Sequence, residues 1–442
     1  MELDSGNAAW MLTSASLVLL MTPGLALFYG GMSRAKSVLN MMMMSFGAMG
    51  VIGVVYVLWG WSMSYGTQSV AGIFNNPFES FGLAGALLDG DGNYVLNGFN
   101  YPVAIDVAFQ VTFAIITTAL ISGAIAERVK FSAWMIFAGI WVTLAYFPMA
   151  HMVWGGGLLS GSENSLAAAI FGTTDGAANV APLDFAGGTV VHINAGVAGL
   201  VLALIIGKRK GFGKIPMRPH NLTLTMLGAG LLWFGWFGFN AGSAFAADGV
   251  AGLAWVNTTA ATAAAILGWL VVEKIRDGHA TSLGAASGIV AGLVAITPAA
   301  GALNPVGSIV LGVIAGVACA FAVGLKYKLG FDDSLDVVGV HLVGGLVGTV
   351  LIGFLSTGGS VFFREDGSFG FGGLDQLWIQ ILIALAAVVF SGIVTAVIGF
   401  AIKATIGWRV PEDVESAGID LAEHGESAYE GISAGRIATE VK

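Results

Sequence analysis

The sequence has 442 residues, of which 56% are hydrophobic and only 10% are charged, with a mean hydropathy of +0.83. Soluble domains carry roughly a quarter charged residues, so this composition excludes a soluble globular protein and predicts an integral membrane protein. The net charge of −9 is not by itself a reason to expect a basic partner. The sole cysteine, Cys319, excludes an intrachain disulfide and makes redox chemistry unexpected.

Apolar stretches recur along the chain at the length that a membrane helix needs. A bilayer core of about 30 Å is crossed by about 20 apolar residues in a helix. Eleven such stretches predict an all-α integral membrane fold. No basic segment precedes the first of them, so it is expected to be a retained span and not a cleaved signal peptide. The stretches lie near residues 8–30, 39–66, 101–126, 131–152, 187–207, 222–244, 253–272, 283–297, 305–325, 337–357 and 376–402.

The Lys and Arg residues divide unequally between the two sides of this predicted bundle. When the loops are assigned alternately to the two sides, 17 of the 18 fall on one side and only Arg364 falls on the other. Basic residues near span ends are retained in the cytosol, so the N-terminus is expected outside and the C-terminus in the cytoplasm. A missed span would exchange the sides of every later loop, so the division favours an odd number of spans.

Eleven spans divide into two halves of five plus one extra helix. Because five is odd, the halves would lie in opposite orientations, which predicts a 5+5 inverted repeat as in many transporters. Val191-His192 in the fifth span and Val340-His341 in the tenth resemble one another and support this interpretation.

A polar segment follows the last span. Residues 409–442, rich in Glu, Asp, Gly and Ser, are expected to form a cytosolic and loosely structured tail. The predicted organisation is therefore a transmembrane domain over residues 1–408 and a tail over residues 409–442.

Two histidines, His192 and His341, lie inside predicted spans. Ionisable side chains in hydrocarbon cost several kcal/mol and commonly mark a pathway, although an isolated one is as often a neutral ring bonded to a neighbouring helix. Their corresponding positions in the two halves favour a shared role, in which they line a narrow path for a small polar solute. No third ligand is evidently placed for zinc. The remaining histidines, His151, His220, His279 and His424, are expected to be solvated or capping.

Asp184 precedes His192 by eight residues and lies near the outer end of the fifth span. Its carboxylate is expected to cap unpaired amides at the start of that helix. Structural roles alone would explain most of this segment.

Aromatic residues in three of the predicted spans are a further candidate feature. An aromatic face attracts a cation at about 0.5–2 kcal/mol, which suits weak capture at a pore mouth. Tryptophan at a membrane interface is nevertheless usually an anchor. The candidates are Phe109 and Phe113 in the third span, Trp154 at the end of the fourth, and Trp236 and Phe239 in the sixth, with Ser243 one turn further.

Enzyme motifs are poor. The chain contains no G-K-[ST] phosphate-binding motif and no H-E-x-x-H zinc motif, and its one G-x-S-x-G, Gly431 to Gly435, lies in the polar tail. The protein is therefore expected not to be an enzyme, and neither a cofactor nor a metal is predicted.

Taken together, these segments resemble the ammonium transporter family, the bacterial, plant and fungal relatives of the Rhesus proteins, over nearly the whole chain. The motifs that carry the resemblance are T-P-G-L-A-L-F-Y-G-G-M-S-R from Thr22, A-H-M-V-W-G-G-G from Ala150, D-F-A-G-G-T-V-V-H-I-N from Asp184, W-F-G-F-N-A-G-S from Trp236 and D-V-V-G-V-H from Asp336.

This resemblance implies a homotrimer in the cytoplasmic membrane, with one pore per subunit that passes ammonium or ammonia, and also methylammonium. It implies no nucleic-acid partner. The matching motifs imply these roles: Trp154, Phe113, Ser243 and Asp184 at an external recruitment site, Phe113 and Phe239 as a gate, His192 and His341 in the pore, and Phe109, Trp236 and Thr297 as further lining. Asp184 would act through structure or through deprotonation of the substrate.

The tail segment Gly418 to Tyr429 resembles the family's cytosolic regulatory tail, which implies docking of a PII-type nitrogen regulatory protein. A tail that only contacts its own trimer is the simpler alternative. Two other functions remain open, a Rhesus-type gas channel and an ammonium sensor that signals through the tail. Trp154 and Ser243 favour the ammonium transporter branch over the gas channel.

Overall fold

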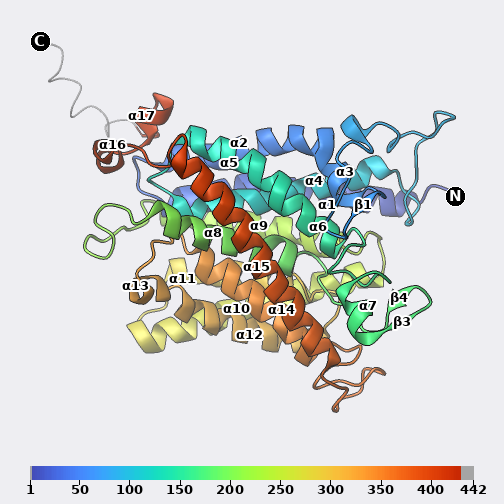
Figure 1. Cartoon of the computed structure of the whole chain (residues 1–442). Coiled ribbons are helices and arrows are strands. Elements are labelled where there is room, and N and C mark those ends of the chain that lie inside the picture. Colours follow the sequence, from blue (N-terminus) through green and yellow to red (C-terminus); the bar gives the residue numbers. More distant parts are fainter. Residues whose placement is uncertain (1, 430–442) are drawn as a thin grey trace, which may run out of the picture.

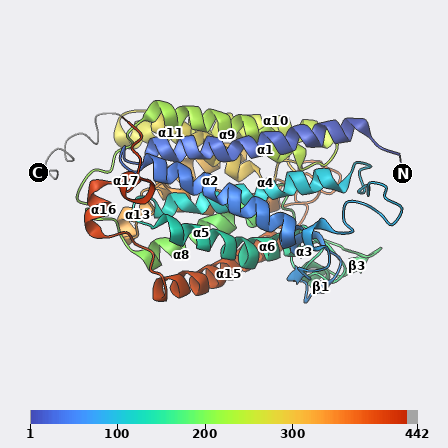
Figure 2. The same cartoon turned by 90° about the horizontal axis from the view of Figure 1, so that it is seen from above.

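Long apolar helices make up most of residues 2–429, the part of the chain that this computed structural model describes, and they run side by side between two ends of the molecule (Figure 1). Figure 2 shows α1, α9 and α10 along one side and α15 along the other. The main helices are α1 (Ser5–Met32), α2 (Val38–Val55), α4 (Val103–Ile121), α5 (Phe131–Trp141), α6 (Phe147–Val153), α8 (Asn194–Ile206), α9 (Leu222–Gly242), α10 (Gly249–Asp277), α11 (Ser282–Ile296), α12 (Pro305–Ala322), α14 (Val343–Leu355) and α15 (Asp375–Ala404).

Four π-helical segments continue these helices and lengthen them into full spans. They are η1 (Tyr56–Gly60), η4 (Val142–Tyr146), η5 (Gly188–Ile193) and η6 (Val338–Leu342). Single π-helical turns within helices are frequent at functional sites. The remaining short elements are α3 (Trp61–Tyr65), η2 (Phe81–Leu83), η3 (Ser122–Ile125), α7 (Leu166–Phe171) and α13 (Leu325–Leu329), with two antiparallel strand pairs, β1 (Ser69–Val70) with β2 (Phe74–Asn75) and β3 (Thr173–Thr174) with β4 (Ala177–Ala178).

Within residues 2–429, ten helical segments are long and apolar enough to cross a membrane. The predicted eighth span corresponds to α11, which has 15 residues and is shorter than the other segments. Pro298 follows just beyond its end, and a proline disfavours the helical conformation of the residue before it. The protein is a multi-pass membrane protein.

Small residues allow neighbouring helices to approach closely. A Cβ atom added at Gly312 would lie 2.2 Å from the carbonyl oxygen of Ala261, and one added at Gly316 would lie 2.2 Å from that of Ala265. These four residues join α12 to α10. Helices in a membrane associate chiefly through such van der Waals contact, because lipid is as apolar as their side chains.

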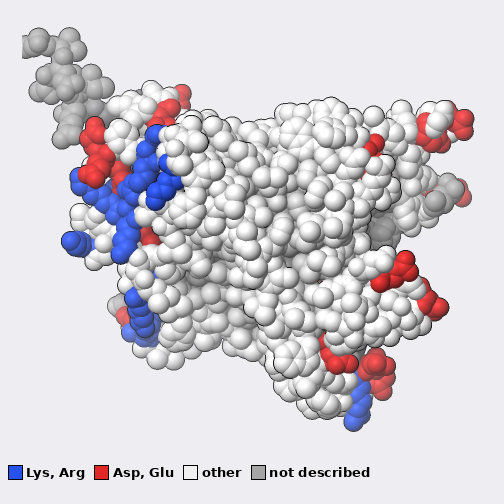
Figure 3. Space-filling view, viewed as in Figure 1, with Lys and Arg blue, Asp and Glu red and all other residues white. Residues whose placement is uncertain are grey.

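On the face drawn in Figure 3, charged side chains lie at the two ends of the molecule, and a broad uncharged band separates them. On the face shown, Lys and Arg gather at one end, which we call the basic end. The other end carries the long loops that contain β1–β4 and α7, and we call it the loop end. This distribution is that of a bilayer-spanning bundle.

The described part of the tail is ordered, so the prediction of a loosely structured tail is wrong for residues 409–429. It forms α16 (Glu412–Ala417) and α17 (Asp420–His424) against the basic end. The Asp420 carboxylate accepts hydrogen bonds from the backbone N–H groups of Leu39 (3.0 Å) and Asn40 (2.8 Å) at the start of α2. The tail is therefore held by capping a membrane helix. Gly431 to Gly435 lie outside the described residues.

Candidate functional site

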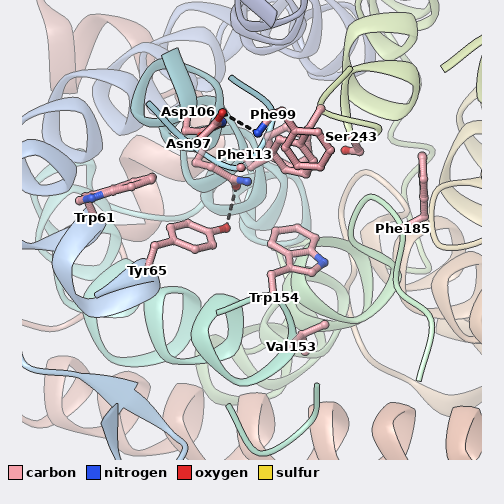
Figure 4. A pocket seen from close by; sticks show the side chains of 13 residues that line it. Trp61, Tyr65, Asn97, Phe99, Asp106, Phe113, Val153, Trp154, Phe185 and Ser243 are labelled. Atoms are coloured by element: carbon pink, nitrogen blue, oxygen red, sulfur yellow. Dashed lines mark hydrogen bonds between the residues drawn. The ribbon is translucent and has the colours of Figure 1, made fainter. Parts of the chain in front are cut away.

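A cavity of about 430 Å³ opens at the loop end (Figure 4). Its walls come from α3, α4, α6, α9 and the loops between spans, and most of its lining side chains are aromatic. Three residues that were predicted to act together, Trp154, Phe113 and Ser243, all line it. The full lining is Trp61, Tyr65, Asn97, Gly98, Phe99, Asp106, Gln110, Phe113, Val153, Trp154, Phe185, Ser243 and Phe245.

Helix ends position the two polar groups of this aromatic wall. Trp154 is the C-cap of α6, and its indole Nε1–H donates to the backbone oxygen of Asp184 at 2.8 Å. Its ring stands edge-on to Phe113, with centroids 6.0 Å apart and an interplanar angle of 86°. Ser243 is the C-cap of α9, and its hydroxyl donates to the backbone oxygen of Phe239 at 2.8 Å.

Two stacked rings close the floor of this cavity. Phe113 of α4 and Phe239 of α9 lie 4.1 Å apart at an angle of 19°, and both are almost completely buried. Phe113 lines the outer cavity, and Phe239 lines a second cavity beyond it. Phe109 does not line either cavity; it packs edge-on against Phe113 at 4.8 Å. An ion moving inward would have to displace the stacked pair.

The second, inner cavity is narrow and apolar, with a volume of about 10 Å³. That space holds about one water molecule. Helices of both predicted halves contribute to its wall. The lining residues are Met21, Leu25, Phe28, Ile116, Leu120, Val191, His192, Leu232, Trp236, Phe239, Val290 and His341.

The two predicted pore histidines meet in this inner cavity. The Nδ1 atoms of His192 and His341 lie 3.2 Å apart, and the two rings are buried, with centroids 5.3 Å apart. A hydrogen bond between two ring nitrogens requires one donor and one acceptor, so each ring determines the tautomer of the other. Nε2 of His192 has no hydrogen-bond partner among the described residues and is available to a solute.

Trp236 completes the inner wall. Its ring stacks on His192 with centroids 5.4 Å apart and an angle of 15°. Its Nε1–H donates to Thr297 Oγ1 at 2.8 Å. Thr297 lines neither cavity and is fully buried, so its position is that of a support for Trp236.

Each histidine lies on a π-helical segment and follows, by eight residues, an aspartate that precedes the start of that segment. His192 lies on η5 and follows Asp184; His341 lies on η6 and follows Asp333. Asp333 accepts hydrogen bonds from the backbone N–H groups of Val337 (3.0 Å) and Val338 (2.7 Å). Sequence reasoning missed Asp333, although the equal spacing to the histidine was visible.

Asp184 uses its whole carboxylate as a helix cap. It accepts from the backbone N–H groups of Gly187 (2.9 Å), Thr189 (2.9 Å) and Val190 (3.2 Å), and also from the N–H of Gly188 and the hydroxyl of Thr189. The side chain is buried and is not part of the lining of the outer cavity. This geometry agrees with the expected capping role.

One of the histidines expected to be solvated is buried. His151 is 1% exposed; its ring nitrogens contact the hydroxyl of Ser69 (2.8 Å) and the side-chain amide of Asn75 (3.0 Å). The prediction of a solvated or capping ring is therefore wrong: the ring is buried and contacts side chains of the β1–β2 hairpin, which folds over the end of α6. Within residues 2–429, His, Cys, Asp and Glu side chains form no group of three that could hold a metal ion.

Known proteins resemble this chain in both sequence and structure. The model of the Ammonium Transporter Family matches residues 9–429. An ammonium transporter of Mycobacterium tuberculosis is 54% identical over 97% of this chain and 91% of its own length, and one of Aquifex aeolicus is 48% identical over 97% and 94%. Among solved structures, Candida albicans Mep2 matches with a TM-score of 0.81 at 30% identity, covering 100% of this chain and 93% of that one. A protein described as a sensor Amt protein also has a TM-score of 0.81, at 27% identity, covering 95% and 98%.

Proposed function

This chain belongs to the ammonium transporter family, and we propose that it carries ammonium or ammonia across the cell membrane through the two cavities described above. One observation carries the proposal. Two stacked rings separate an open aromatic cavity from a buried apolar passage that holds two hydrogen-bonded histidines. Such an arrangement captures a cation at its mouth yet opposes the passage of a hydrated ion.

The outer cavity suits weak and reversible capture of ammonium. Trp154 and Phe113 present aromatic faces and edges, and each cation–π contact contributes about 0.5–2 kcal/mol. The hydroxyl of Ser243 keeps lone pairs that can accept from an ammonium N–H, because its own proton is used by Phe239 O. We therefore assign Trp154, Phe113 and Ser243 to recruitment, and Phe113 with Phe239 to the gate.

The inner cavity sets the chemistry of passage. Water and ammonium resemble potassium in size, so a hydrated cation pore would leak, whereas an apolar tube passes ammonia selectively. A bare ion in such a tube would lose its hydration without compensation. Ammonium must therefore lose its proton or its water at the gate, and the ring nitrogens of His192 and His341 then offer the polar contacts along the path. Trp236 and its support Thr297 hold His192 in place.

The proposed architecture has eleven spans if α11 is counted, in a 5+5 inverted repeat plus α15. The matching aspartate and histidine pairs of η5 and η6 support this repeat. The basic end would face the cytoplasm, with the N-terminus outside. We further propose a homotrimer, one pore per subunit, that also accepts methylammonium.

The tail, residues 409–442, is proposed to be regulatory, through docking of a PII-type protein at the basic end. Its helices α16 and α17 already bind that end, so a partner placed there would contact both tail and transporter. Deleting the residues after Trp408 should deregulate transport and abolish capture of a PII-type protein by membranes that contain the transporter. Unchanged capture by the truncated transporter would refute the docking role.

The transport proposal is tested by current recorded from liposomes that contain the purified protein during an ammonium pulse. Trp154→Leu should raise the ammonium concentration for half-maximal current by about three- to tenfold, in the range of one cation–π contact. Trp378→Leu is the matched control, because that residue of α15 is 56% exposed on the outside of the bundle and should leave the curve unchanged.

Each alternative has its own signature in the same experiment. A Rhesus-type gas channel would change the internal pH without carrying current. A sensor would bind ammonium without measurable flux of either kind, and the likeness to the sensor Amt protein makes this outcome worth the measurement. An unchanged half-maximal concentration in Trp154→Leu would remove the recruitment role while leaving transport in place.

A further inference from the structure

The outer cavity contains a carboxylate that the aromatic site does not use. Asp106 lines this cavity together with Trp154, Phe113 and Ser243, and Figure 4 shows it beside Asn97 on the same wall as Phe113. Among the lining residues it is the one charged side chain, and Lys, Arg and His are all missing from the lining. The cavity therefore has a negative wall and no positive one.

Three cavity residues follow the same face of α4. Asp106, Gln110 and Phe113 are spaced four and three residues apart, which places them on one side of a helix. This stripe runs from a carboxylate through a carboxamide to the first ring of the gate. It brings polar oxygen atoms and an aromatic face into one line toward the inner cavity.

Neutral groups alone contact the Asp106 carboxylate. The hydroxyl of Tyr101 donates to Oδ1 at 2.5 Å, and the side-chain amide of Asn97 donates to Oδ2 at 2.6 Å. Asp106 forms no ion pair with any described residue. It also lies in the first turn of α4, where the helix dipole favours a negative charge. These contacts stabilise the carboxylate without neutralising it.

Asp184 offers the opposite case. Its carboxylate accepts five hydrogen bonds at the start of η5, and it does not line the outer cavity. Each oxygen of Asp106, by contrast, accepts a single hydrogen bond and keeps a lone pair free. Of these two carboxylates, Asp106 is therefore the one that is available to a cation in the outer cavity.

We propose that Asp106 and Gln110 form an outer binding subsite for a small monovalent cation, which holds ammonium before it reaches Trp154, Phe113 and Ser243. This inference rests on the proposed transport function and deepens it. The carboxylate supplies attraction at longer range than the aromatic faces do, and it raises the concentration of cations at the mouth. The carboxamide oxygen of Gln110, which already accepts from the hydroxyl of Tyr65 at 2.8 Å, adds a second acceptor.

The first test is the concentration dependence of ammonium current in liposomes. Asp106→Asn removes the charge and should raise the half-maximal concentration by roughly three- to tenfold, the size expected for one charge acting within several ångströms at a protein surface. The maximal current should change little. The shift should shrink at high ionic strength, because salt screens the attraction. Asp106→Glu should restore most of the affinity.

Two control variants separate charge from structure. Tyr101→Phe keeps the carboxylate but removes one of its two hydrogen bonds, so it should shift the half-maximal concentration clearly less than Asp106→Asn does. Asp91→Asn removes a charge from an exposed loop at the same end without touching the cavity, and it should have no effect. An equal shift in Tyr101→Phe and Asp106→Asn would mean that Asp106 acts only by holding the loop, and would overturn the subsite.

The second test does not depend on transport. Crystals of the protein soaked in thallium(I), a monovalent cation of similar size, should show an anomalous peak within contact distance of an Asp106 oxygen, and Asp106→Asn crystals should lack it. No peak at Asp106 in the unmodified protein would overturn the inference. A peak without any ammonium current in liposomes would instead retain the cation subsite and remove the transport function on which its proposed role rests.

Discussion

The two π-helical segments η5 and η6 share one local arrangement but lie in different surroundings. Each carries one of the two proposed pore histidines eight residues after an aspartate, and each aspartate caps the segment through backbone N–H groups. At the loop end, Asp184 binds only neutral donors and lies next to Trp154, which lines an open cavity. At the basic end, Asp333 lies among charged groups.

The charged neighbours of Asp333 make the difference clear. Lys326 donates to the backbone oxygen of Asp333 at 3.0 Å and pairs with Asp336 at 2.6 Å. The preceding residue, Asp332, pairs with Arg209 at 2.9 Å, and Arg209 also reaches Glu127 at 3.0 Å. The comparison shows that η5 at the loop end is held by its own cap, whereas η6 at the basic end also lies beside ion pairs that join three loops.

The largest effect is expected from breaking the outer cap. Asp184→Asn leaves one side-chain acceptor for five donors, so at least two donors lose a hydrogen bond to a charged group, at about 1.5–3 kcal/mol each. Asp333→Asn should cost less, because two N–H groups depend on that carboxylate. Thermal unfolding of both variants in detergent provides the comparison. A larger loss of stability in Asp333→Asn would contradict the inference that η5 depends more on its aspartate than η6 does.

The histidines should show no such asymmetry in function. If His192 and His341 fix one another's tautomer, His192→Leu and His341→Leu should each lower ammonium current at least tenfold, about 1.4 kcal/mol, with the fold retained. The double variant should be little worse than either single one. His192→Asp and His341→Glu should keep a polar path and weaken selectivity against potassium. Full current and full selectivity in both leucine variants would exclude the paired mechanism.

The ion pairs of Arg209 with Asp332 and Glu127 should make stability sensitive to acid. Burial opposes the charged form of Asp332, but the hydrogen bonds and charge of Arg209 outweigh it and lower the pKa of Asp332 below its ordinary value. A lowered pKa in the folded protein stabilises it above about pH 4, and this contribution is lost as the pH falls further. Asp332→Asn should therefore lower stability at pH 7 by roughly 1–3 kcal/mol and flatten its decline in acid.

A surface ion pair provides the control for that measurement. Glu412 lies 3.6 Å from Lys210, and both side chains are largely exposed. Glu412→Gln should change the unfolding temperature very little at either pH, because exposed pairs contribute little. If the stability of the unmodified protein and that of Asp332→Asn declined equally with falling pH, the ion pair of Asp332 with Arg209 would not stabilise the basic end.

The smallest loss of stability is expected from a change in the tail, which binds the basic end through Asp420. Asp420→Ala removes the cap from the start of α2 and should cost about 1 kcal/mol, the usual value for a helix cap. The loss should appear as faster proteolysis within residues 409–429, with the transmembrane domain intact. Asp413→Ala, an exposed acidic residue of α16, is the matched control. Equal cleavage of both variants would exclude a capping role for Asp420.

Sequence alone determined the membrane character of the protein, the approximate position of its spans and its family. Hydropathy and the spacing of motifs are properties of short segments, so they can be read without knowing which segments meet. The eighth predicted span, 283–297, coincides with α11 to within one residue, although that helix is shorter than the ten long apolar helices. The ring of His151 is covered by a hairpin that periodicity does not reveal. The order of the tail was missed because its helices are short and polar and depend on contact with the basic end.

Only the tertiary structure decided which side chains meet. The two histidines are 149 residues apart in the chain yet share a hydrogen bond, and Phe113 stacks on Phe239 across two helices. The exposure of the Asp106 carboxylate to the outer cavity also depends on the folded arrangement. Sequence patterns report the face of a helix that is apolar, but hydrogen bonds and cavities form between helices whose relative rotation is set by close packing along their whole length. The arrangement of the two cavities is therefore a property of the assembled bundle.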